Sequence, residues 1–512
     1  MRLSIEITFV ALIVVVIVLV VFRDVFWYLR SLKYKKQGIP IRYFPLSGFN
    51  KYMDSPKKNA LADFVKLFQS TKHKNQTEDL ILINNGSSRP LIFINSKDLV
   101  KEYHQKETQV TYKEDMFGFP GQNTFVFSKD MHLVKNARAM FSEIFSPENL
   151  RKQTPRFKAF AQRRFNQIRD EVKRAQAKGN KLPEIELKRF TKYILTDFLN
   201  YVLFGDEFPE LDSKPLIDQI EYLIEEYFFT EVSPENILTL GLSTKLGFDS
   251  EYNKAKLLFD RVVQKVKQVI RERENNKNYQ FGCNTVDLLI LKNRELEAQG
   301  KTELVMTREQ IVDNIFMMVF TGVETSRSLT DGCFFKLSRD QALQQQLRES
   351  VRKEVLDTGN GDVFDKYDQS ELLERFIKES LRLWPPVPIT PQRKIAKTFK
   401  LGPYTLYKGD YISLSLMTLM IKPEVWNQPM KFDLKKYEDK KRINELSNSA
   451  YAPFNAGKRS CIGRNLADIM IRLILCNFLD QFELYKSNKP NRRFMVLTFG
   501  LEHCNVRLRC IQ

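Results

Sequence analysis

The sequence predicts a mainly α-helical protein with small β-sheets, placed behind an N-terminal transmembrane helix. Three observations predict this fold class. Residues 7–22 are almost purely apolar, apolar residues recur at helical spacing in several long segments of the second half, and residues 397–414 alternate around glycine turns. No Gly/Ser-rich or Pro-rich linker, repeat or low-complexity tract divides the 512 residues. We therefore expect one large domain behind the helix, a helical body with a smaller β-rich region.

The N-terminal apolar segment is interpreted as a membrane anchor. Its 16 residues would span roughly 24 Å as a helix, and flanking apolar residues make a tilted span feasible. Basic residues from Arg23 onward outnumber Arg2, which favours a single pass with the body in the cytosol. A cleaved signal peptide is the alternative, but no small-x-small site follows. The expected division is an anchor over residues 1–28, a basic, proline-bearing neck over 29–49, and one catalytic domain over 50–512.

Composition limits the compartment and the partners. The six cysteines are widely scattered, which suits a reducing compartment rather than a disulfide or zinc framework. Four histidines leave little for a histidine-based metal site. The net charge of +19 could meet nucleic acid, anionic lipid or an acidic protein, with dispersed solvated lysines as the alternative explanation. No nucleic-acid motif accompanies the charge, so we expect no nucleic-acid partner.

Residues 307–337 are predicted to form one long, mostly buried helix that opens with a Thr307/Gln310 capping box. Glu324 and Thr325 place a carboxylate and a hydroxyl in its apolar middle, where an unused buried carboxylate is costly. The hydroxyl could hold a water and relay protons that the carboxylate supplies. The alternative is a threonine bonded back to its own helix, beside a surface-facing Glu324.

Two further helices and a small sheet are expected downstream. One helix begins near Ser338, where Ser338 and Gln341 match a second capping box. The next covers residues 370–384 and stops at two prolines. On it Glu379 and Arg382 share a face, and we favour a buried structural clamp without a catalytic role over a surface pair. Residues 397–414 then form the small sheet.

The most informative pattern is F-x-x-G-x-R-x-C-x-G, filled by Phe454, Gly457, Arg459, Cys461 and Gly463. The following residues have helical spacing, so Cys461 is expected just before a helix N-terminus. A ligating sulfur must be an anion, and free N–H groups and the positive end of the helix dipole would stabilise it.

This local chemistry fits a cysteine that binds haem iron. The two glycines would let the backbone turn tightly and approach a flat ligand. Arg459 could bind a haem propionate, with Arg393 as a second candidate. Phe454 could cover the sulfur. A lone thiolate on haem iron favours O–O cleavage. The alternative is a buried structural cysteine, which the full pattern disfavours.

At this point the residues resemble the cytochrome P450 superfamily in its microsomal, membrane-anchored form, over nearly the whole chain. The resemblance implies a P450-like fold that binds haem b (iron protoporphyrin IX), with Cys461 as the axial ligand of its iron. It places Thr325 and Glu324 on the oxygen-activating pair of the central helix, and Glu379 and Arg382 on an E-x-x-R pair. It also places Arg459 and Arg138 on arginines that bind propionates.

Three positions depart from the family pattern. Val134 stands where a W-x-x-x-R motif expects tryptophan, which removes one expected propionate contact. Thr321 replaces the small residue that usually opens the central-helix motif. Lys436 stands where an arginine would complete the E-x-x-R clamp, and lysine cannot form the same bidentate fork.

The resemblance implies a monooxygenase that inserts one atom of O2 into a hydrophobic small molecule. Electrons would come from NADPH through a separate flavoprotein reductase, and cytochrome b5 is compatible as a further donor. It also implies the endoplasmic reticulum membrane and contact with its lipid. Lys129, Lys135, Lys458 and Arg464 are candidates for reductase docking, with ordinary solvated charge as the alternative.

Other functions on the same fold stay open. One is a hydroperoxide isomerase or dehydratase, although the retained Glu324 and Thr325 favour oxygen activation. Another is a non-catalytic, haem-bound sensor. The simplest alternative is a membrane-anchored helical protein without haem.

Overall fold

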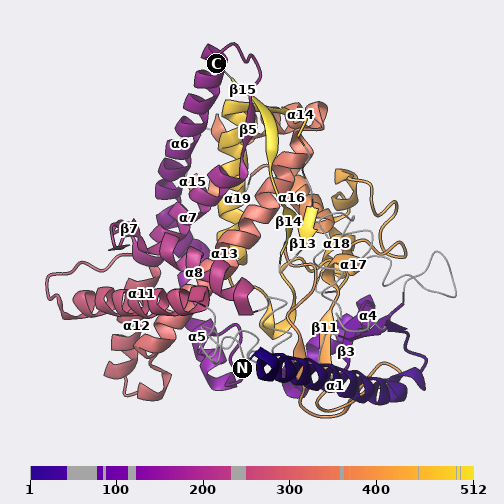
Figure 1. Ribbon diagram of the computed structural model, residues 1–512. Coiled ribbons are helices and arrows are strands. Elements are labelled where there is room, and N and C mark those ends of the chain that lie inside the picture. The colour runs from indigo at the N-terminus through magenta and orange to yellow at the C-terminus, as the bar shows by residue number, and fades with distance from the viewer. Residues whose placement is uncertain are drawn as a thin grey trace.

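The computed structural model describes residues 2–42, 78–84, 88–113, 123–231, 250–357, 363–367, 369–447, 449–489, 491, 493–495 and 498–511. Helices dominate the described chain (Figure 1). Their bounds are α1 (Arg2–Lys35), α4 (Lys97–Val110), α5 (Met131–Ile144), α6 (Pro147–Ala177), α7 (Lys188–Phe204), α8 (Leu216–Glu231), α11 (Ser250–Asn275), α12 (Thr285–Ala298), α13 (Arg308–Leu337), α14 (Gln341–Val351), α15 (Val363–Lys366), α16 (Glu371–Leu383), α17 (Leu416–Met420), α18 (Lys440–Leu446) and α19 (Arg464–Gln481).

Helix α13 is the centre of the helical body. It contacts α7, α8, α11, α16 and α19 and is buried along most of its length. A side chain at Gly322 would place its Cβ 2.9 Å from a methyl group of Leu199, so the glycine lets α7 and α13 approach closely.

A six-stranded mixed sheet forms the β-rich region beside α1 and α4 (Figure 1). Its strand order is β1-β2-β3-β11-β8-β4. The strands are β1 (Ile41–Arg42), β2 (Leu80–Ile83), β3 (Leu91–Ile94), β4 (Thr111–Tyr112), β8 (Arg393–Ile395) and β11 (Tyr411–Leu414). The hairpin β9 (Phe399–Leu401) and β10 (Tyr404–Leu406) turns at Gly402, which has a positive φ of 54°. The small sheet predicted for residues 397–414 is therefore present.

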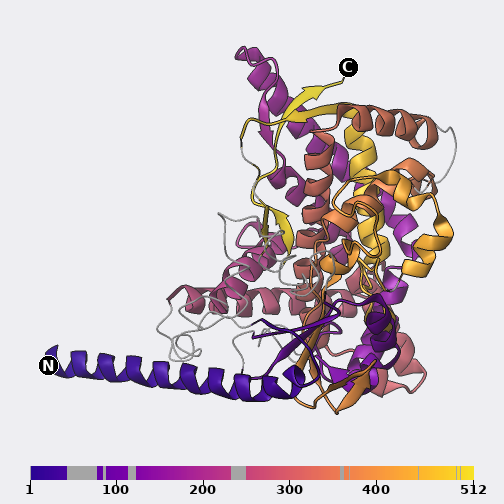
Figure 2. The same cartoon turned by 90° about the vertical axis from the view of Figure 1, so that its right-hand side faces the viewer.

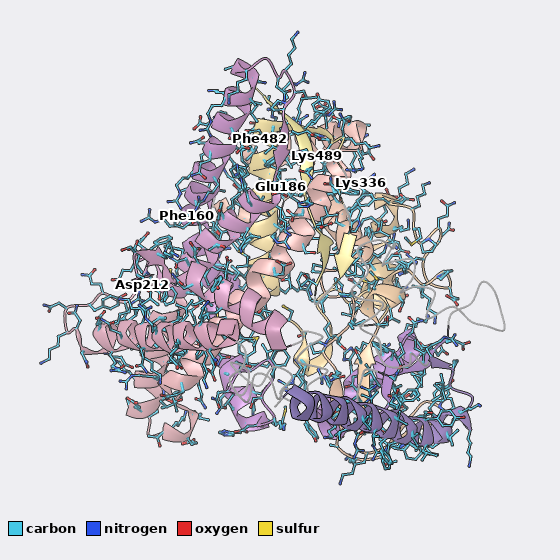
Figure 3. All side chains as sticks on the ribbon, in the orientation of Figure 1. Phe160, Glu186, Asp212, Lys336, Phe482 and Lys489 are labelled. Carbon is cyan, nitrogen blue, oxygen red and sulfur yellow. The ribbon has the colours of Figure 1, made fainter. Side chains whose placement is uncertain are left out.

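Three smaller sheets complete the topology. Strands β12 (Phe482–Lys486), β15 (Asn505–Cys510) and β5 (Glu184–Glu186) form one sheet, near the labelled Phe482 and Glu186 in Figure 3. The others are the pairs β13 (Arg493–Met495) with β14 (Phe499–Leu501) and β6 (Glu210–Leu211) with β7 (Lys214–Pro215). Strand β14 packs on α13, where the Ser328 hydroxyl donates to the Phe499 carbonyl.

Polar side chains cap the N-termini of α13 and α14. The Thr307/Gln310 capping box at the start of α13 is confirmed, with both reciprocal hydrogen bonds present. The second predicted capping box is wrong. Ser338 ends α13, and α14 is capped by Asp340, whose carboxylate accepts from the Leu343 N–H. Only a few residues separate the two helices. Ser338 is therefore the C-cap of α13, although the sequence pattern assigned it to the start of the next helix.

Helix α1 runs from the N-terminus to Lys35, so residues 29–35 of the expected neck are helical. Its N-terminal part projects beyond the body, and its C-terminal part lies against it (Figure 2). Trp27 and Tyr34 are completely buried and pack into the β-rich core. Within the described residues, no helix meets the length and apolarity needed to cross a membrane.

The C-terminal turns of α1 are fixed to the β-rich region by polar contacts. The Tyr34 hydroxyl donates to the Asp410 carboxylate at 2.7 Å, and Lys33 Nζ lies 2.7 Å from the same oxygen. Gln37 exchanges two hydrogen bonds with the backbone of Thr405. Burial and the neighbouring Asp410 raise the pKa of Tyr34, so this hydroxyl stays protonated as a donor.

Glu379 and Arg382 form a bidentate ion pair on α16, with N–O distances of 2.7 and 2.8 Å. Both side chains have no exposed surface. The guanidinium also donates to the carbonyls of Met420 and Lys431. The carboxylate accepts from the Asp433 N–H and the Tyr437 hydroxyl. The pair therefore joins α16 to the irregular segment that leads toward the cysteine loop.

Lys436 lies at the edge of this cluster. Its Nζ is 3.7 Å from Glu379 Oε1 and donates to the Lys431 carbonyl at 2.8 Å. The lysine thus adds charge and one backbone contact, without a second bidentate fork.

Replacing Arg382 with leucine should destabilise the protein strongly, because the buried Glu379 would lose its bidentate partner and keep only Lys436 Nζ at 3.7 Å. We expect a loss of about 3–5 kcal/mol. Arg375→Leu on the same helix is the matched control, since its partners Glu371 and Glu438 are exposed and such pairs contribute about 0–1 kcal/mol. Thermal melting of the two variants measures the difference. Equal melting shifts would contradict a clamp at Glu379 and Arg382.

Candidate functional site

The cysteine loop precedes α19 and is closed by its own backbone. The Cys461 N–H donates to the Phe454 carbonyl at 2.8 Å, around the 3-10 turn η4 (Gly457–Arg459). Gly457 has a φ of 70°, and a Cβ there would lie 2.9 Å from Glu107 Oε1 and 3.1 Å from His104 Nδ1. This position therefore requires glycine both for its backbone conformation and for the contact with α4.

Cys461 is a solvent-exposed residue, and many protein atoms lie around its thiol. Burial raises its pKa, while a hydrogen bond from the Gly463 backbone and the charges of Arg138 and Arg464 oppose that rise. Gly463 is the N-cap of α19 with an ordinary φ of −83°. A Cβ at this position would lie 4.0 Å from the Cys461 sulfur, an ordinary van der Waals distance, so neither crowding nor the tight turn that the sequence suggested requires glycine here.

A buried basic cluster lies next to this loop, with members from four separate segments. Arg459 Nη1 donates to the Phe125 carbonyl at 2.9 Å, and Arg138 Nη2 donates to the Ser460 carbonyl at 2.9 Å. Arg393 Nη1 pairs with Glu107 at 3.1 Å. Lys113 is the fourth cation. Among the described residues, Glu107 is the carboxylate whose charge acts on these cations.

Two arginines of this basic cluster have lowered pKa values. Burial, together with the charges of Arg393 and Arg138, lowers the pKa of Arg459 to about 10. Burial likewise lowers the pKa of Arg138. Burying like charges is costly unless an anion neutralises them, so the cluster is built to receive negative charge.

Sequence reasoning identified three members of this cluster and missed the others. Glu107 and Lys113 lie more than 270 residues before Arg393 in the chain, and no local motif contains them. The one available signal was a run of polar residues along α4. Val134 is buried and has no hydrogen-bond donor in its side chain, so it supplies nothing to the cluster.

The middle of α13 opens to solvent within an otherwise buried helix. Thr321 is exposed and Glu324 and Thr325 are partly exposed, while the residues on both sides are buried. Thr325 Oγ1 donates to the Thr321 carbonyl at 2.6 Å, and Thr321 Oγ1 donates to the Met317 carbonyl at 2.7 Å. Both threonines therefore bond back to their own helix, as the alternative interpretation expected, on a part of it that faces open space.

Glu324 is held by side chains on two elements. Arg327 Nε donates to its carboxylate at 2.9 Å, and the Thr498 hydroxyl donates at 3.1 Å. Arg327 is itself buried and pairs with Asp331 at 2.8 Å. The carboxylate is 39% exposed, so it is neither buried nor free in solution.

These residues fit a flat, dianionic macrocycle with a metal at its centre. The accessible thiol offers a soft ligand for the metal. The basic cluster offers donors for two carboxylates at the edge of the ring. Phe454 is partly buried beside the loop, and Arg464 lies 5.7 Å from the centre of its ring. Thiol, cations and aromatic group together match the chemistry of haem.

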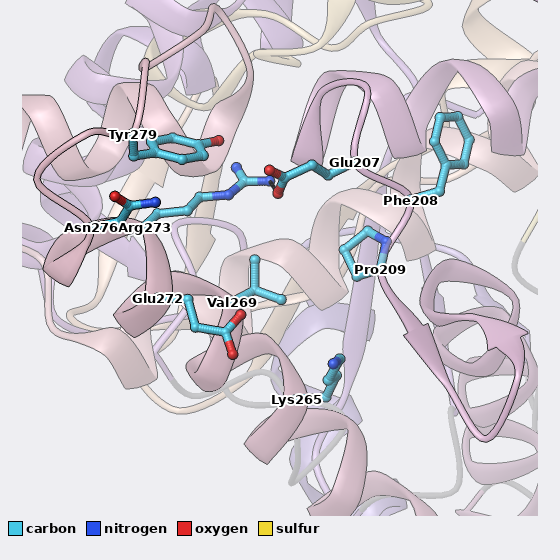
Figure 4. Close-up of a pocket in the computed structure, with 9 residues that line it drawn as sticks. All are labelled: Glu207, Phe208, Pro209, Lys265, Val269, Glu272, Arg273, Asn276 and Tyr279. Carbon is cyan, nitrogen blue, oxygen red and sulfur yellow. Dashed lines mark hydrogen bonds and ion pairs between the residues drawn. The ribbon is translucent and has the colours of Figure 1, made fainter.

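A separate surface cavity of about 340 Å³ lies between α11 and the segment after α7 (Figure 4). Glu207, Arg273 and Tyr279 line it together with residues of α11. Arg273 is almost fully buried and pairs with Asp287 at 2.8 Å and Glu207 at 2.9 Å. None of the predicted site residues lines this cavity, and Arg273 already has carboxylate partners.

Comparisons with known proteins agree with the geometry. The Cytochrome P450 family model matches residues 63–502. The chain is 22% identical to Cytochrome P450 6B1 of Papilio polyxenes over 92% of both chains. It is 24% identical to Cytochrome P450 monooxygenase aclL of Aspergillus oryzae over 73% of both. The solved structure of the cytochrome P450DA heme domain superposes with a TM-score of 0.75 at 20% identity, covering 93% of this chain and 98% of that chain.

The structural match confirms the predicted fold, mainly helical with small sheets. The family match extends over most of the chain and includes the cysteine loop, the central helix and the E-x-x-R helix. The chain belongs to the cytochrome P450 family and is a haem-thiolate monooxygenase that uses O2.

Proposed function

We propose that Cys461 is the axial ligand of the haem iron and that Arg459, Arg138 and Arg393 bind the propionates. The single observation that supports this assignment is the accessible Cys461 next to a group of cations for which Glu107 is the shared carboxylate. Gly457 shapes the loop, and Gly463 directs its N–H toward the sulfur. Phe454 shields one side of the ligand loop. Glu379, Arg382 and Lys436 are structural.

Haem, when bound, supplies the chemistry that activates O2, and the chain supplies protons and orientation. Thr325 holds a water with its hydroxyl in this proposal, and the back-bond to Thr321 supports it, because that bond uses only the hydroxyl proton and leaves the oxygen to accept. Glu324 supplies protons from its partly exposed carboxylate. Arg327 and Thr498 hold that carboxylate in place between solvent and helix.

The electrons come from NADPH through a separate flavoprotein reductase, with cytochrome b5 as a compatible further donor. Lys129, Lys135, Lys458 and Arg464 are exposed and lie on the segments that carry the cysteine loop and its neighbours. Such a basic surface suits an acidic partner and would speed its association at low salt. The substrate is a hydrophobic small molecule.

We also assign the protein to the endoplasmic reticulum membrane, with residues 1–28 as a single-pass anchor, 29–49 as the neck and 50–512 as the cytosolic domain. The apolar composition of residues 7–22 and the basic residues after them support this assignment. Val18, Val21 and Phe22 are more than 40% exposed on the projecting part of α1, which leaves apolar surface for lipid.

A hydroperoxide isomerase and a non-catalytic haem sensor are the competing functions on this fold. Both could work without the proton supply that Glu324 and Thr325 provide. Turnover that depends on added reductase and NADPH separates the monooxygenase from both. A screen of lipophilic compounds for substrate-induced shifts of the haem spectrum would then identify the substrate class.

Changing Cys461 to alanine should abolish the red-shifted Soret band of the ferrous–carbonyl complex, because that band requires a thiolate ligand. The measurement is a carbon monoxide difference spectrum of the purified, full-length protein. Cys510→Ser is the control, since that partly exposed thiol is in β15 and should leave the band intact. Iron held in the alanine variant with an unchanged band would overturn the assignment of Cys461.

Changing Thr325 to alanine should uncouple NADPH use from product formation, because the proton relay loses its hydroxyl. We expect product per NADPH to fall about a hundredfold, the low end for general acid–base groups. Thr325→Ser should recover most of the loss. Thr330→Ala is the matched control, because Thr330 makes the same back-bond, to the Ser326 carbonyl at 2.8 Å, from a buried position. Equal coupling in the two alanine variants would remove Thr325 from the mechanism.

Deleting residues 2–22 should move the protein from the membrane pellet to the soluble fraction while haem content stays unchanged. The deletion removes the apolar segment but keeps Trp27, Tyr34 and their contacts with the body. Fractionation followed by an alkaline wash measures the change, with the full-length chain as control. A truncated protein that resists the alkaline wash would argue against residues 7–22 as the anchor.

A further inference from the structure

We propose that Asp331 is a positioning residue for the proton supply at Glu324, and that it acts by sharing the Arg327 guanidinium with that carboxylate. The inference rests on the proposed function, in which Glu324 supplies protons at Thr325. It adds a residue that lies outside the motifs of the chain. Asp331 has no exposed side-chain surface, so it acts through Arg327 and not by contact with a substrate.

Glu324, Arg327 and Asp331 form one row along α13. They are three and four residues apart, so their side chains lie on the same face of the helix. Arg327 Nε donates to one Glu324 oxygen at 2.9 Å and Nη2 pairs with the other, whereas Nη1 donates to Asp331 Oδ2 at 2.8 Å. The exposed fraction of the side chain falls along the row, from 39% to 2% and then to 0%. Arg327 therefore links the open middle of α13 to the buried core.

This row carries more negative than positive charge. Burial raises the pKa of Asp331 to about 6, although Arg327 opposes that rise, so the carboxyl is mostly ionised at neutral pH. The titratable groups that face the row from other elements are Lys188 of α7, Glu186 of β5 and Cys504. Burial raises the pKa of the Cys504 thiol, which therefore stays neutral. Two cations, Arg327 and Lys188, thus face the three carboxylates of Glu324, Asp331 and Glu186.

The excess negative charge favours the protonated form of Glu324. A carboxylate with a guanidinium of its own holds a proton poorly, because the opposite charge stabilises the ionised form. Asp331 takes up part of the Arg327 charge, so Glu324 can bind a proton from solvent and pass it on at neutral pH. The Thr498 hydroxyl holds the same carboxylate from a second element. Sharing the guanidinium thus makes an arginine-paired carboxylate usable as a proton source.

The first test is an infrared pH titration of the purified, full-length holoprotein, which follows the carboxyl band of Glu324 and needs no turnover. The band is assigned by its loss in Glu324→Gln. Asp331→Asn should move the midpoint of this band down by about one pH unit, the low end for a changed charge partner. Asp331→Glu keeps the negative charge and should leave the midpoint close to its original value.

Asp287→Asn is the matched control for the infrared titration. Asp287 lies on α12, is as buried as Asp331, and pairs with the buried Arg273 at the same distance of 2.8 Å. Its loss should destabilise the protein without moving the Glu324 midpoint. An unmoved midpoint in Asp331→Asn, or an equal shift in Asp287→Asn, would overturn the charge sharing.

The second test is NADPH oxidation by the same proteins with added flavoprotein reductase, in H2O and in D2O. Asp331→Asn should slow oxidation about tenfold at neutral pH and enlarge the solvent isotope effect, because one pH unit means tenfold fewer protonated Glu324 side chains. In a Glu324→Gln background the same change should add nothing, because Asp331 then has no carboxylate to act on. Additive slowing would contradict the inference. Unchanged oxidation in Glu324→Gln alone would instead refute the proposed function at Glu324, whatever the infrared shift.

Discussion

Positive charge that the polypeptide does not neutralise is the constraint on which the centre of this structure depends. Arg138, Arg393, Arg459 and Lys113 converge from three helical and strand segments and a loop onto the single carboxylate of Glu107. A folded chain keeps such a cluster only if burial elsewhere offsets its cost or if an anionic ligand completes it. Under the assignment proposed above, the propionates would provide the second condition. Cofactor binding and folding of this region would then be coupled.

Helix α13 combines two demands that usually conflict. The stretches on either side of its middle are mostly buried, and Gly322 lets α7 approach within van der Waals contact. Its middle presents hydroxyls and a carboxylate to open space. Each threonine there satisfies its own proton within the helix, which leaves an acceptor oxygen without leaving an unpaired buried donor. The helix can thus carry polar chemistry through an apolar core at little cost in stability.

Local features of the site could be predicted from the sequence, and distant ones could not. The cysteine loop, the capping box at Thr307 and the Glu379–Arg382 spacing are set by residues a few positions apart, so a linear pattern contains them. Lys113 and Glu107 reach the cluster through strand pairing and a helix–loop contact across hundreds of residues. The cap of α14 was misassigned because Ser338 and Asp340 both precede that helix, and only the length of the preceding helix decides between them.

The difference between local and distant contacts also explains why the position of the C-terminal turns of α1 could not be predicted from the sequence. Its apolar composition predicts a helix that meets lipid, but composition alone cannot say where the helix meets protein. The position of the helix is fixed by Asp410, whose buried carboxylate accepts a hydrogen bond from Tyr34 and pairs with Lys33. Within the described chain, no other segment makes such contacts with this carboxylate. Trp27, two turns earlier on the same face, is buried with them in the β-rich core. A helix held at two such points by a buried polar group and a packed indole cannot pivot freely, so the described part of α1 near Tyr34 behaves as part of the folded body.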